Sequence, residues 1–349
     1  MMTDKHQTSQ SSVFLRACRA EKTPYTPVWF MRQAGRYQKF YRKIRRTVPF
    51  IDLCKNPELA AEVTVRACEQ TGADAAILFS DILLILEPLG FTVKYSAGEG
   101  PVVSGRIRIA SDVDRIRALD RCDSMSYVFD AVRLARKVLS PEIALIGFCG
   151  APFTIASYIL EGGKSGSFAR TKMFMRADAG GWDALMNKIC PVLTDNLRRQ
   201  IDAGADAVQI FDSWAGCLSP EEYRKFVLPY TRAVVRALKP RVPMIHFGTG
   251  TGPFLKDFAS VGAGVISVDH RVRLDAAWKT IGYGKAIQGN LDPKILLSSP
   301  AVIRRHAKRI LDQAGGRAGH IFNLGHGVLP DTPEENVSAL IDFVHELSA

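Results

Sequence analysis

The sequence has no long apolar run, and its cysteines do not form paired motifs. No stretch approaches the ~20 apolar residues that cross a bilayer, and "VFLRACRA" (13–20) is too short and too basic for a signal-peptide core. The seven cysteines are scattered, and none forms a C-x-x-C motif. These absences argue against membrane proteins and disulfide-rich secreted proteins. We therefore expect a cytoplasmic protein with reduced, mostly buried thiols.

Motifs for nucleotides, metals and serine catalysis are also missing. The turn "MRQAGRY" (31–37) does not have the glycine spacing of a dinucleotide site. "GGKSG" (162–166) lacks the upstream glycine of a P-loop, because Tyr158 stands at that position. No H-x-C or H-E-x-x-H motif occurs, and Ser213 in "FDSWAG" is not part of a G-x-S-x-G elbow. We expect no bound nucleotide, no metal and no serine triad.

Acidic residues are absent from one stretch of a chain that is basic overall. The net charge is +11, and residues 32–46 include seven Lys or Arg side chains and no Asp or Glu. Such a run is usually a solvated helix face. It can also be a site for a polyanion, either a nucleic acid or a small molecule with many carboxylates. Charge alone does not choose between these readings.

Eight short apolar runs, separated by segments with helical spacing, organise the 349 residues. Strands that alternate with helices predict a parallel sheet with right-handed crossovers. Eight repeats favour a closed (β/α)₈ barrel over an open doubly wound sheet. We expect one barrel over residues 24–349, a partly disordered segment at 1–23, and a β-hairpin inserted at 90–108 after the second strand. The predicted strands are 28–31, 75–81, 143–150, 207–213, 243–248, 264–270, 285–290 and 320–327.

Polar or glycine-flanked residues stand where the apolar runs end, which is where barrel enzymes place their active sites. For Asp269, Asn290 and Asp292 we favour caps or loop hydrogen bonds, and for His246 a structural role is as plausible as a functional one. Arg32 and Arg36 stand together on the first turn. They favour binding of a carboxylate, since Arg binds carboxylates through two donors. The other strand-end candidates are Asp81, Phe148, Asp212, Ser213 and His326.

Five blocks of sequence, in order, resemble the uroporphyrinogen decarboxylase family. They are "PVWFMRQAGRY" (27–37), "FSDIL" (79–83), "GFCGAPFTIASYILEGG" (147–163), "IFDSWAG" (210–216) and "NLGHGVLPDTPEENV" (323–337). The family removes carbon dioxide from the four acetate side chains of uroporphyrinogen to give coproporphyrinogen. The resemblance implies a (β/α)₈ barrel, a homodimer, and a reaction without metal or organic cofactor. It also favours a small tetrapyrrole polyanion over nucleic acid as the partner of the basic segment.

The resemblance further implies roles for individual residues. Asp81 would lie under the pyrrole N–H groups, although a carboxylate there can also simply cap the next helix. Arg32 and Arg36 would bind the reacting acetates, and Arg32 or a water it holds would deliver protons. By the same matching, Tyr158 would hydrogen-bond near Asp81 and the acetate. The remaining implied substrate contacts are Arg45, Ser213 and His326 for carboxylates, and Phe148 and Phe211 for the pyrrole faces.

Two other classes remain to be compared with this reading. Corrinoid-dependent methyltransferases resemble the family in fold and use zinc, with a His-x-Cys motif at the fifth strand. Here "IHFGTG" (245–250) has His246, Phe247 and Gly248, with no thiol. A non-enzymatic protein that binds nucleic acid or tetrapyrroles would not need an ordered Asp, Tyr and His at the mouth of a barrel.

Overall fold

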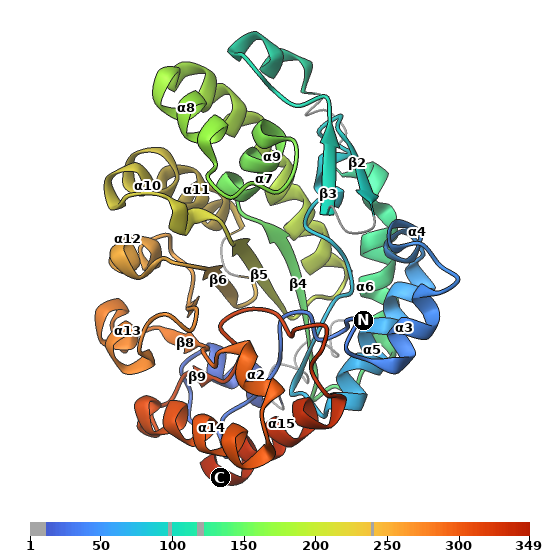
Figure 1. The fold of residues 1–349 in the computed structure, drawn as a ribbon, viewed down its shortest axis with the longest axis vertical. Helices are drawn as coiled ribbons and strands as arrows, with labels where there is room; N and C mark the ends of the chain where they lie inside the picture. The colour runs from blue at the N-terminus through green and yellow to red at the C-terminus, as the bar shows by residue number, and fades with distance from the viewer. Residues whose placement is uncertain (1–11, 97–99, 117–121, 239–240) are drawn as a thin grey trace.

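A computed structural model describes residues 12–96, 100–116, 122–238 and 241–349. Helices surround a curled central sheet in chain order, and the β2–β3 hairpin stands away from that sheet (Figure 1). The α-helices are α2 (Val13–Cys18), α3 (Lys39–Arg45), α4 (Phe50–Lys55), α5 (Pro57–Thr71), α6 (Ser126–Val138), α7 (Pro152–Glu161), α8 (Ala169–Ala177), α9 (Ala179–Ala203), α10 (Pro220–Phe226), α11 (Leu228–Leu238), α12 (Leu255–Ala259), α13 (Leu274–Ile281), α14 (Pro300–Ala314) and α15 (Glu334–Ser348).

Within the described residues, seven parallel strands form the sheet, in the order β1-β4-β5-β6-β7-β8-β9. Each strand lies inside one of the predicted apolar runs. The sheet is therefore the one that the alternation of strands and helices predicts, with each strand beside the next along the chain. The strands are β1 (Ala75–Ile77), β4 (Ala144–Gly150), β5 (Ala207–Asp212), β6 (Met244–Gly248), β7 (Val265–Ser267), β8 (Ala286–Gln288) and β9 (His320–Ile321).

The chain around Val28 closes the ring between the last and the first strand. Val28 forms a parallel bridge with Phe322, and its carbonyl accepts a hydrogen bond of 2.9 Å from the backbone N–H of Asp74. The barrel prediction is confirmed, but the predicted strand at 28–31 is reduced to this single bridge. Side chains replace the ladder beyond it, since the N–H of Phe30 donates to Gln33 Oε1 at 3.3 Å.

The interior of the barrel contains a layer of polar side chains. Gln288 Nε2 donates to Gln209 Oε1 at 3.0 Å and to Ser267 Oγ at 2.8 Å, while Trp29 Nε1 donates to Gln288 Oε1 at 2.9 Å. Strands β5 and β8 are not neighbours in the sheet, so these side chains meet across the interior. All four side chains are fully buried, and the hydrogen bonds offset much of the desolvation of their polar atoms, although Gln209 Nε2 has no partner among the described residues.

The predicted hairpin insertion is confirmed. Strands β2 (Thr92–Ser96) and β3 (Gly100–Ser104) pair antiparallel. The N–H of Val103 donates to the carbonyl of Gly162 at 2.9 Å, which ties the hairpin to the end of α7. The insertion therefore lies beside the carboxyl end of β4 and can supply side chains to the barrel mouth.

The N-terminal segment is described only in part. The predicted disorder at 1–23 falls on residues 1–11, which lie outside the described residues, and on residues 12–23, which include α2. Phe14 of α2 is fully buried, and its ring lies 6.5 Å from that of Trp29. No helix in the described part of the chain is both long and apolar enough to cross a membrane.

Candidate active site

Asp81 lies four residues beyond the end of β1, on the edge of the barrel where all the parallel strands end. Its Oδ1 atom accepts a hydrogen bond of 2.7 Å from the N–H of Leu83, the residue just before the short 3₁₀ turn Leu84–Leu86 (η1), which itself has no side-chain cap. The side chain is half-buried rather than enclosed. This single local bond leaves the other carboxylate oxygen available at the mouth.

The electrostatic surroundings of Asp81 act in opposite directions. Burial raises the pKa of its carboxyl group, while the Leu83 N–H, the Tyr95 hydroxyl and the Arg32 guanidinium favour the ionised form. Tyr158 belongs to the same group, because Asp81 helps burial to raise the pKa of its hydroxyl and Arg32 opposes the rise. The structure thus brings together Arg32, Asp81 and Tyr158 from three separate segments of the chain.

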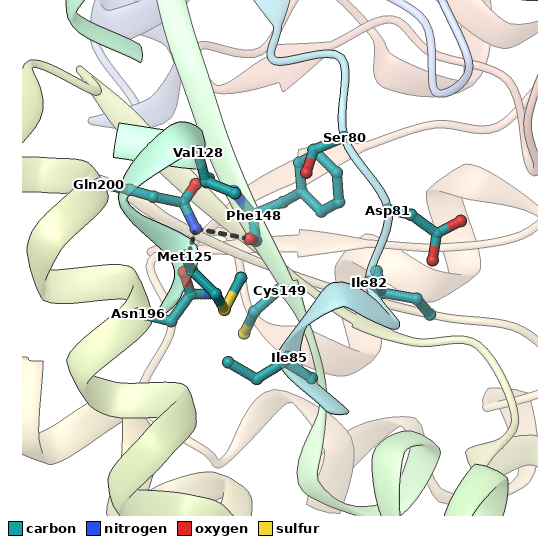
Figure 2. A pocket seen from close by; sticks show the side chains of 10 residues that line it. All are labelled: Ser80, Asp81, Ile82, Ile85, Met125, Val128, Phe148, Cys149, Asn196 and Gln200. Atoms are coloured by element: carbon teal, nitrogen blue, oxygen red, sulfur yellow. Dashed lines mark hydrogen bonds between the residues drawn. The ribbon is translucent and has the colours of Figure 1, made fainter. Parts of the chain in front are cut away.

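A cavity with room for about one water, some 10 Å³, lies behind Asp81 (Figure 2). Its wall includes Gln200, which exchanges two hydrogen bonds of 2.9 Å with the backbone of Phe148. In Figure 2 the carboxyl group of Asp81 points away from Gln200 and Cys149. The carboxylate is therefore not directed into this small cavity.

Arg32 has a backbone conformation that is uncommon for a bulky residue. Its φ is 58°, in the left-handed region that side chains other than Gly, Asn and Asp seldom adopt. The side chain crosses Gly327, where an added Cβ would lie 2.5 Å from Arg32 Cδ, so only glycine leaves room for it. The strained turn and the glycine both direct the exposed guanidinium toward the mouth.

Neither arginine of the opening turn is neutralised by the described residues. Arg32 and Arg36 are both exposed, and neither forms an ion pair with any described carboxylate, whereas other arginines such as Arg136 do. Arg42 stabilises the turn instead, by donating from Nη1 to the carbonyls of Arg36 and Tyr37 at 2.7 and 2.6 Å. Two uncompensated cations at a barrel mouth are suited to an anionic ligand.

Aromatic side chains form the apolar part of the mouth. The rings of Phe148 and Phe211 lie 5.5 Å apart and edge to face, and the ring of Phe247 lies 5.8 Å from that of Phe211. The ring of Tyr158 lies 4.0 Å from that of Trp214. These contacts hold the phenylalanines in defined positions on neighbouring strands and Tyr158 in place on α7.

His326 lies on the Arg32 side of the mouth. Burial lowers its pKa to about 4, with Arg32, His270 and Arg271 adding to the effect and Asp269 opposing it. The imidazole is therefore neutral near pH 7, and it can donate one hydrogen bond and accept another. A neutral ring beside several cations can bind a carboxylate without adding a further positive charge.

Ser213 and Arg45 have local contacts of their own. Ser213 follows β5 directly, and its carbonyl accepts a hydrogen bond of 2.5 Å from Thr249 Oγ1. Arg45 ends α3, donates to the carbonyl of Val48, and lies 5.7 Å from the centre of the Phe50 ring. Arg45 and Asp81 both act on the pKa of the Cys54 thiol, which Asp81 raises and Arg45 lowers.

The comparisons with known proteins agree along the whole chain. The family model described as uroporphyrinogen decarboxylase (URO-D) matches residues 9–347. The chain belongs to the uroporphyrinogen decarboxylase family. Proteins named uroporphyrinogen decarboxylase are 52% identical in Sorangium cellulosum, over 96% of each chain, and 48% identical in Carboxydothermus hydrogenoformans, over 97% of each chain.

Solved structures share the fold at lower identity. A methyltransferase from Methanosarcina mazei matches with a TM-score of 0.76 at 22% identity, over 99% of both chains. A B12-independent methionine synthase from Shewanella sp. W3-18-1 matches with a TM-score of 0.56 at 10% identity, over 83% of this chain and 88% of that chain. At such identities the likeness shows the fold alone. In the described part of the chain, no three His, Cys, Asp or Glu side chains are grouped as a metal site requires.

Several strand-end residues of this family member have local structural partners, as the sequence suggested. Asp269 accepts hydrogen bonds from the N–H groups of Gly250 and Arg271 at 2.8 and 3.2 Å. Asn290 Nδ2 donates to two loop carbonyls, and Asp292 caps the turn before Lys294 at 3.0 Å. The structural reading of these three residues is confirmed.

One site residue was not found from the sequence, namely Tyr95. It lies on β2 of the hairpin, outside the barrel, and its hydroxyl faces the Asp81 carboxyl group. No strand-end rule can find a residue on an inserted hairpin. The only sequence signal is an aromatic residue at the inward position of "TVKYS" (92–96).

Proposed function

We propose that this chain converts uroporphyrinogen III to coproporphyrinogen III by removing carbon dioxide from its four acetate side chains. Family membership supports the reaction, and the grouping of Arg32, Asp81 and Tyr158 at the mouth is the observation that carries the proposal. The substrate is a flexible ring of four pyrroles with acetates and propionates around its edge. Cations at the rim, aromatic walls and one carboxylate suit such a ligand.

The pyrrole ring acts as the electron sink for the reaction. A ring carbon beside the acetate takes a proton, which makes the ring an iminium. The electron pair of the C–CO₂ bond then moves into that iminium, and carbon dioxide leaves. The methylene carbon takes a second proton, and the ring carbon releases the first. In total, one carboxylate and one proton become one methyl group and one carbon dioxide.

Asp81 stabilises the cationic ring in this proposal. The pyrroles are neutral before the reaction, so the carboxylate gains most when one of them is protonated. The mouth is apolar around the carboxylate, and its charge therefore acts more strongly there than it would in water. Asp81 must be ionised for this role, whereas burial raises its pKa. The neighbours of Asp81 that favour its ionised form therefore contribute to the proposed catalysis.

The other predicted residues bind the periphery of the ring. Arg32 and Arg36 hold the reacting acetate, and Tyr158 hydrogen-bonds beside Asp81. The proton comes from Arg32 or from a water that Arg32 holds. The water is included because a free guanidinium is a very weak acid. The proposed contacts to the remaining carboxylates and pyrrole faces are Arg45, Ser213, His326, Phe148 and Phe211.

Anaerobic incubation of the purified protein with uroporphyrinogen III tests the proposal. Mass spectrometry should show stepwise loss of four carbon dioxide molecules, and the turnover should survive exhaustive dialysis against EDTA. A protein that leaves the substrate intact would disprove the activity. Loss of turnover with EDTA and its return with zinc would instead favour the corrinoid-dependent methyltransferase reading.

We also propose that residues 24–349 act as one catalytic unit in a cytoplasmic homodimer. The seven cysteines of the chain are all free, and five are buried, which suits a reducing compartment. Sedimentation equilibrium should give twice the chain mass of 38.4 kDa. A monomer at micromolar concentration would disprove the assembly without affecting the proposed reaction.

A further inference from the structure

The hairpin insertion places one tyrosine at the mouth of the barrel. Along β2, Thr92 and Lys94 are exposed while Val93 and Tyr95 are half-buried, as the alternation of side chains along a strand requires. The ring of Tyr95 lies 5.0 Å from that of Phe50, which fixes its direction. The phenol therefore projects inward from an element that is not part of the barrel.

The Tyr95 hydroxyl is buried without a hydrogen-bond partner among the described residues. A buried hydroxyl without a partner destabilises the folded state, so its presence here calls for an explanation. The Asp81 carboxyl group is close enough to interact with this hydroxyl, but the two do not form a hydrogen bond of normal geometry. A donor and a carboxylate are thus placed opposite each other but not joined.

Asp81 is faced from four elements. Arg32 follows the first bridge, Tyr95 comes from β2, Tyr158 from α7, and Cys54 from α4. The Leu83 N–H already occupies Oδ1. Of the side chains that face Asp81, Arg32 and Tyr158 already have proposed substrate contacts. Tyr95 has none, which leaves its hydroxyl free to act on the carboxylate itself.

We propose that Tyr95 is a positioning residue for Asp81, and that a small turn of the phenol lets its hydroxyl donate a hydrogen bond to the carboxylate in the free protein as well as when the pyrrole ring is bound. The bond aims the carboxylate at the ring N–H groups and keeps it ionised in an apolar site. This inference rests on the proposed function. If Tyr95 were only an aromatic packing partner of Phe50, phenylalanine would serve equally well.

The substitution Tyr95→Phe removes the hydroxyl and keeps the ring. Loss of one hydrogen bond to a charged group should lower kcat by about tenfold or more. The acid limb of the pH profile should move to higher pH, because the ionised form of Asp81 has lost a donor. Binding of the product, coproporphyrinogen, should change less than about twofold, because the phenol is proposed to act on Asp81 and not on the ligand.

Tyr127→Phe is the matched control. Tyr127 also has a buried hydroxyl without a hydrogen-bond partner in the described structure, but its charged neighbour is Glu87 and not Asp81. Its loss should leave both kcat and the pH profile unchanged. A double-mutant cycle adds a second criterion. In an Asp81→Asn background, Tyr95→Phe should cause little further loss, since its partner is already uncharged.

A titration separates failure of this inference from failure of the proposed function. The Asp81 carboxyl signal is followed by ¹³C NMR in aspartate-labelled protein and identified by its absence from Asp81→Asn. Its pKa should be higher in Tyr95→Phe than in the wild type and unchanged in Tyr127→Phe, whether or not the protein decarboxylates uroporphyrinogen. An unchanged Asp81 pKa, or full activity with an unshifted pH profile, would overturn the inference.

Discussion

Asp74 and Asp81 stand at opposite ends of β1, and their surroundings differ in kind. Asp74 precedes the strand, and its carboxylate accepts hydrogen bonds from the Val28 N–H at 2.7 Å and the Tyr25 hydroxyl at 3.2 Å. It also lies 2.8 Å from His345 Nε2. Asp81 follows the strand, with one backbone donor and a carboxyl pKa that burial raises. The Asp74 carboxylate has three partners, whereas the Asp81 carboxylate has a single hydrogen-bond donor among the described residues.

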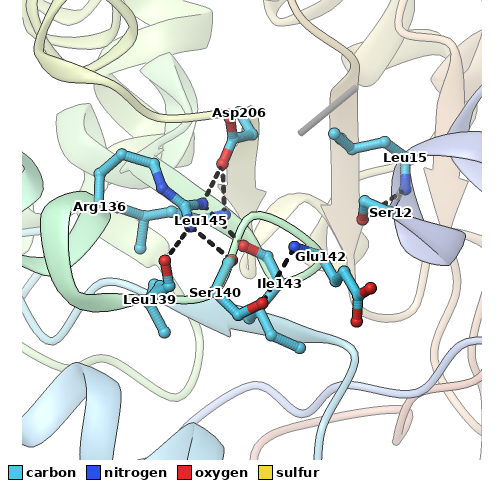
Figure 3. A network of polar contacts seen from close by, with 9 residues as sticks. All are labelled: Ser12, Leu15, Arg136, Leu139, Ser140, Glu142, Ile143, Leu145 and Asp206. Carbon is cyan, nitrogen blue, oxygen red and sulfur yellow. Dashed lines mark hydrogen bonds and ion pairs between the residues drawn. The ribbon is translucent and has the colours of Figure 1, made fainter. Parts of the chain in front are cut away.

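A similar contrast holds between the two ends of the barrel elsewhere in the chain. Asp206 precedes β5, and its Oδ2 accepts from Arg136 Nη1 at 2.7 Å and from the Leu145 N–H at 2.9 Å (Figure 3). Arg136 also donates to three backbone carbonyls, those of Leu139, Ser140 and Ile143, at 2.7–2.8 Å. At the other end of the barrel, Arg32 and Arg36 have no such pairing within the described structure. Charged groups at the end where the strands begin are thus paired and stabilise the fold. Charged groups at the mouth, where the strands end, lack such partners, as expected of the end where barrel enzymes place their active sites.

The largest expected effect comes from exchanging the two aspartates of β1 for asparagine, one at a time. Asp81→Asn removes the charge that stabilises the cationic ring, so kcat should fall by about 10²–10³-fold while product binding persists. The free energy of unfolding should stay the same or rise, because the charged form is already disfavoured by burial. Single-turnover decarboxylation and chemical denaturation measure the two quantities.

The control, Asp74→Asn, should show the opposite pattern. It weakens a carboxylate with three partners, so the free energy of unfolding should fall by about 1 kcal/mol or more, with kcat unchanged in folded protein. Near-normal turnover in Asp81→Asn would contradict the assignment of a catalytic role to Asp81 and a structural role to Asp74.

The next largest effect is on stability and comes from Arg136→Met. The change removes the guanidinium that donates to Asp206, a largely buried carboxylate with side-chain exposure of 12% in the native pair. The free energy of unfolding should fall by about 3 kcal/mol, measured by urea denaturation. The control is Arg133→Met on the same helix, whose partner Asp130 is about half exposed, and there the loss should be under about 1 kcal/mol. Equal losses would show that the Asp206 network has no special role.

A smaller effect on catalysis is expected from Arg36→Lys. The charge remains, but the planar guanidinium that binds a carboxylate through two donors is lost. We expect kcat/KM to fall by about thirtyfold, equivalent to about 2 kcal/mol. Arg46→Lys, an exposed residue of the same basic segment, should change kcat/KM less than about twofold. If the two variants behave alike, the segment acts only through its overall charge.

The smallest effect concerns pH and His320, which is 4% exposed. Burial lowers its pKa to about 4, whereas the unfolded chain binds a proton near pH 6.5. The unfolded state therefore binds more protons than the native state in this window, and stability falls as pH drops below about 6.5. Between pH 7 and 5.5 the loss from this group should be about 1 kcal/mol.

Denaturation at both pH values in His320→Gln measures that contribution. Glutamine does not titrate and can still donate to the Gly289 carbonyl that lies 3.1 Å from His320 Nε2, so the pH dependence should be weaker than in the wild type. His306→Gln on α14 is the control. An unchanged pH dependence in His320→Gln would show that another group is responsible.

Much of the fold could be predicted from local patterns. Alternating apolar runs and helical segments located all the strands and the hairpin, because a buried strand and an amphipathic helix each leave a periodic signature over a few residues. The segment at 28–31 shows the limit of this approach. Its composition predicts a strand, but the side chains of Gln33 and Asn323 take the backbone N–H groups of Phe30 and Met31 at 3.3 and 3.5 Å. Gln33 is close in sequence, but Asn323 is distant, and its contact follows only from the tertiary structure.

From the residue pattern alone, the candidate site was predictable only at strand ends, while Tyr158 and Arg45, which lie on helices, came from the family resemblance. Arg32, Asp81, Phe148, Ser213 and His326 follow from their positions after apolar runs, given a parallel barrel. The geometry that gives them chemistry does not follow from those positions. The positive φ of Arg32, the room left by Gly327 and the burial that lowers the pKa of His326 to about 4 all arise from contacts between distant segments.

The sequence by itself determined the class of architecture, the family and the residue types at the mouth, since these depend on composition, spacing and ordered motifs. Only the tertiary structure decided which of those residues are neighbours, and it added Tyr95 from an inserted hairpin to the surroundings of Asp81. It also decided that the Asp74 carboxylate has several hydrogen-bond partners while the Asp81 carboxylate has one. The physical reason is that burial and electrostatic coupling are properties of through-space distance, and a chain that closes into a ring joins segments that local patterns cannot relate.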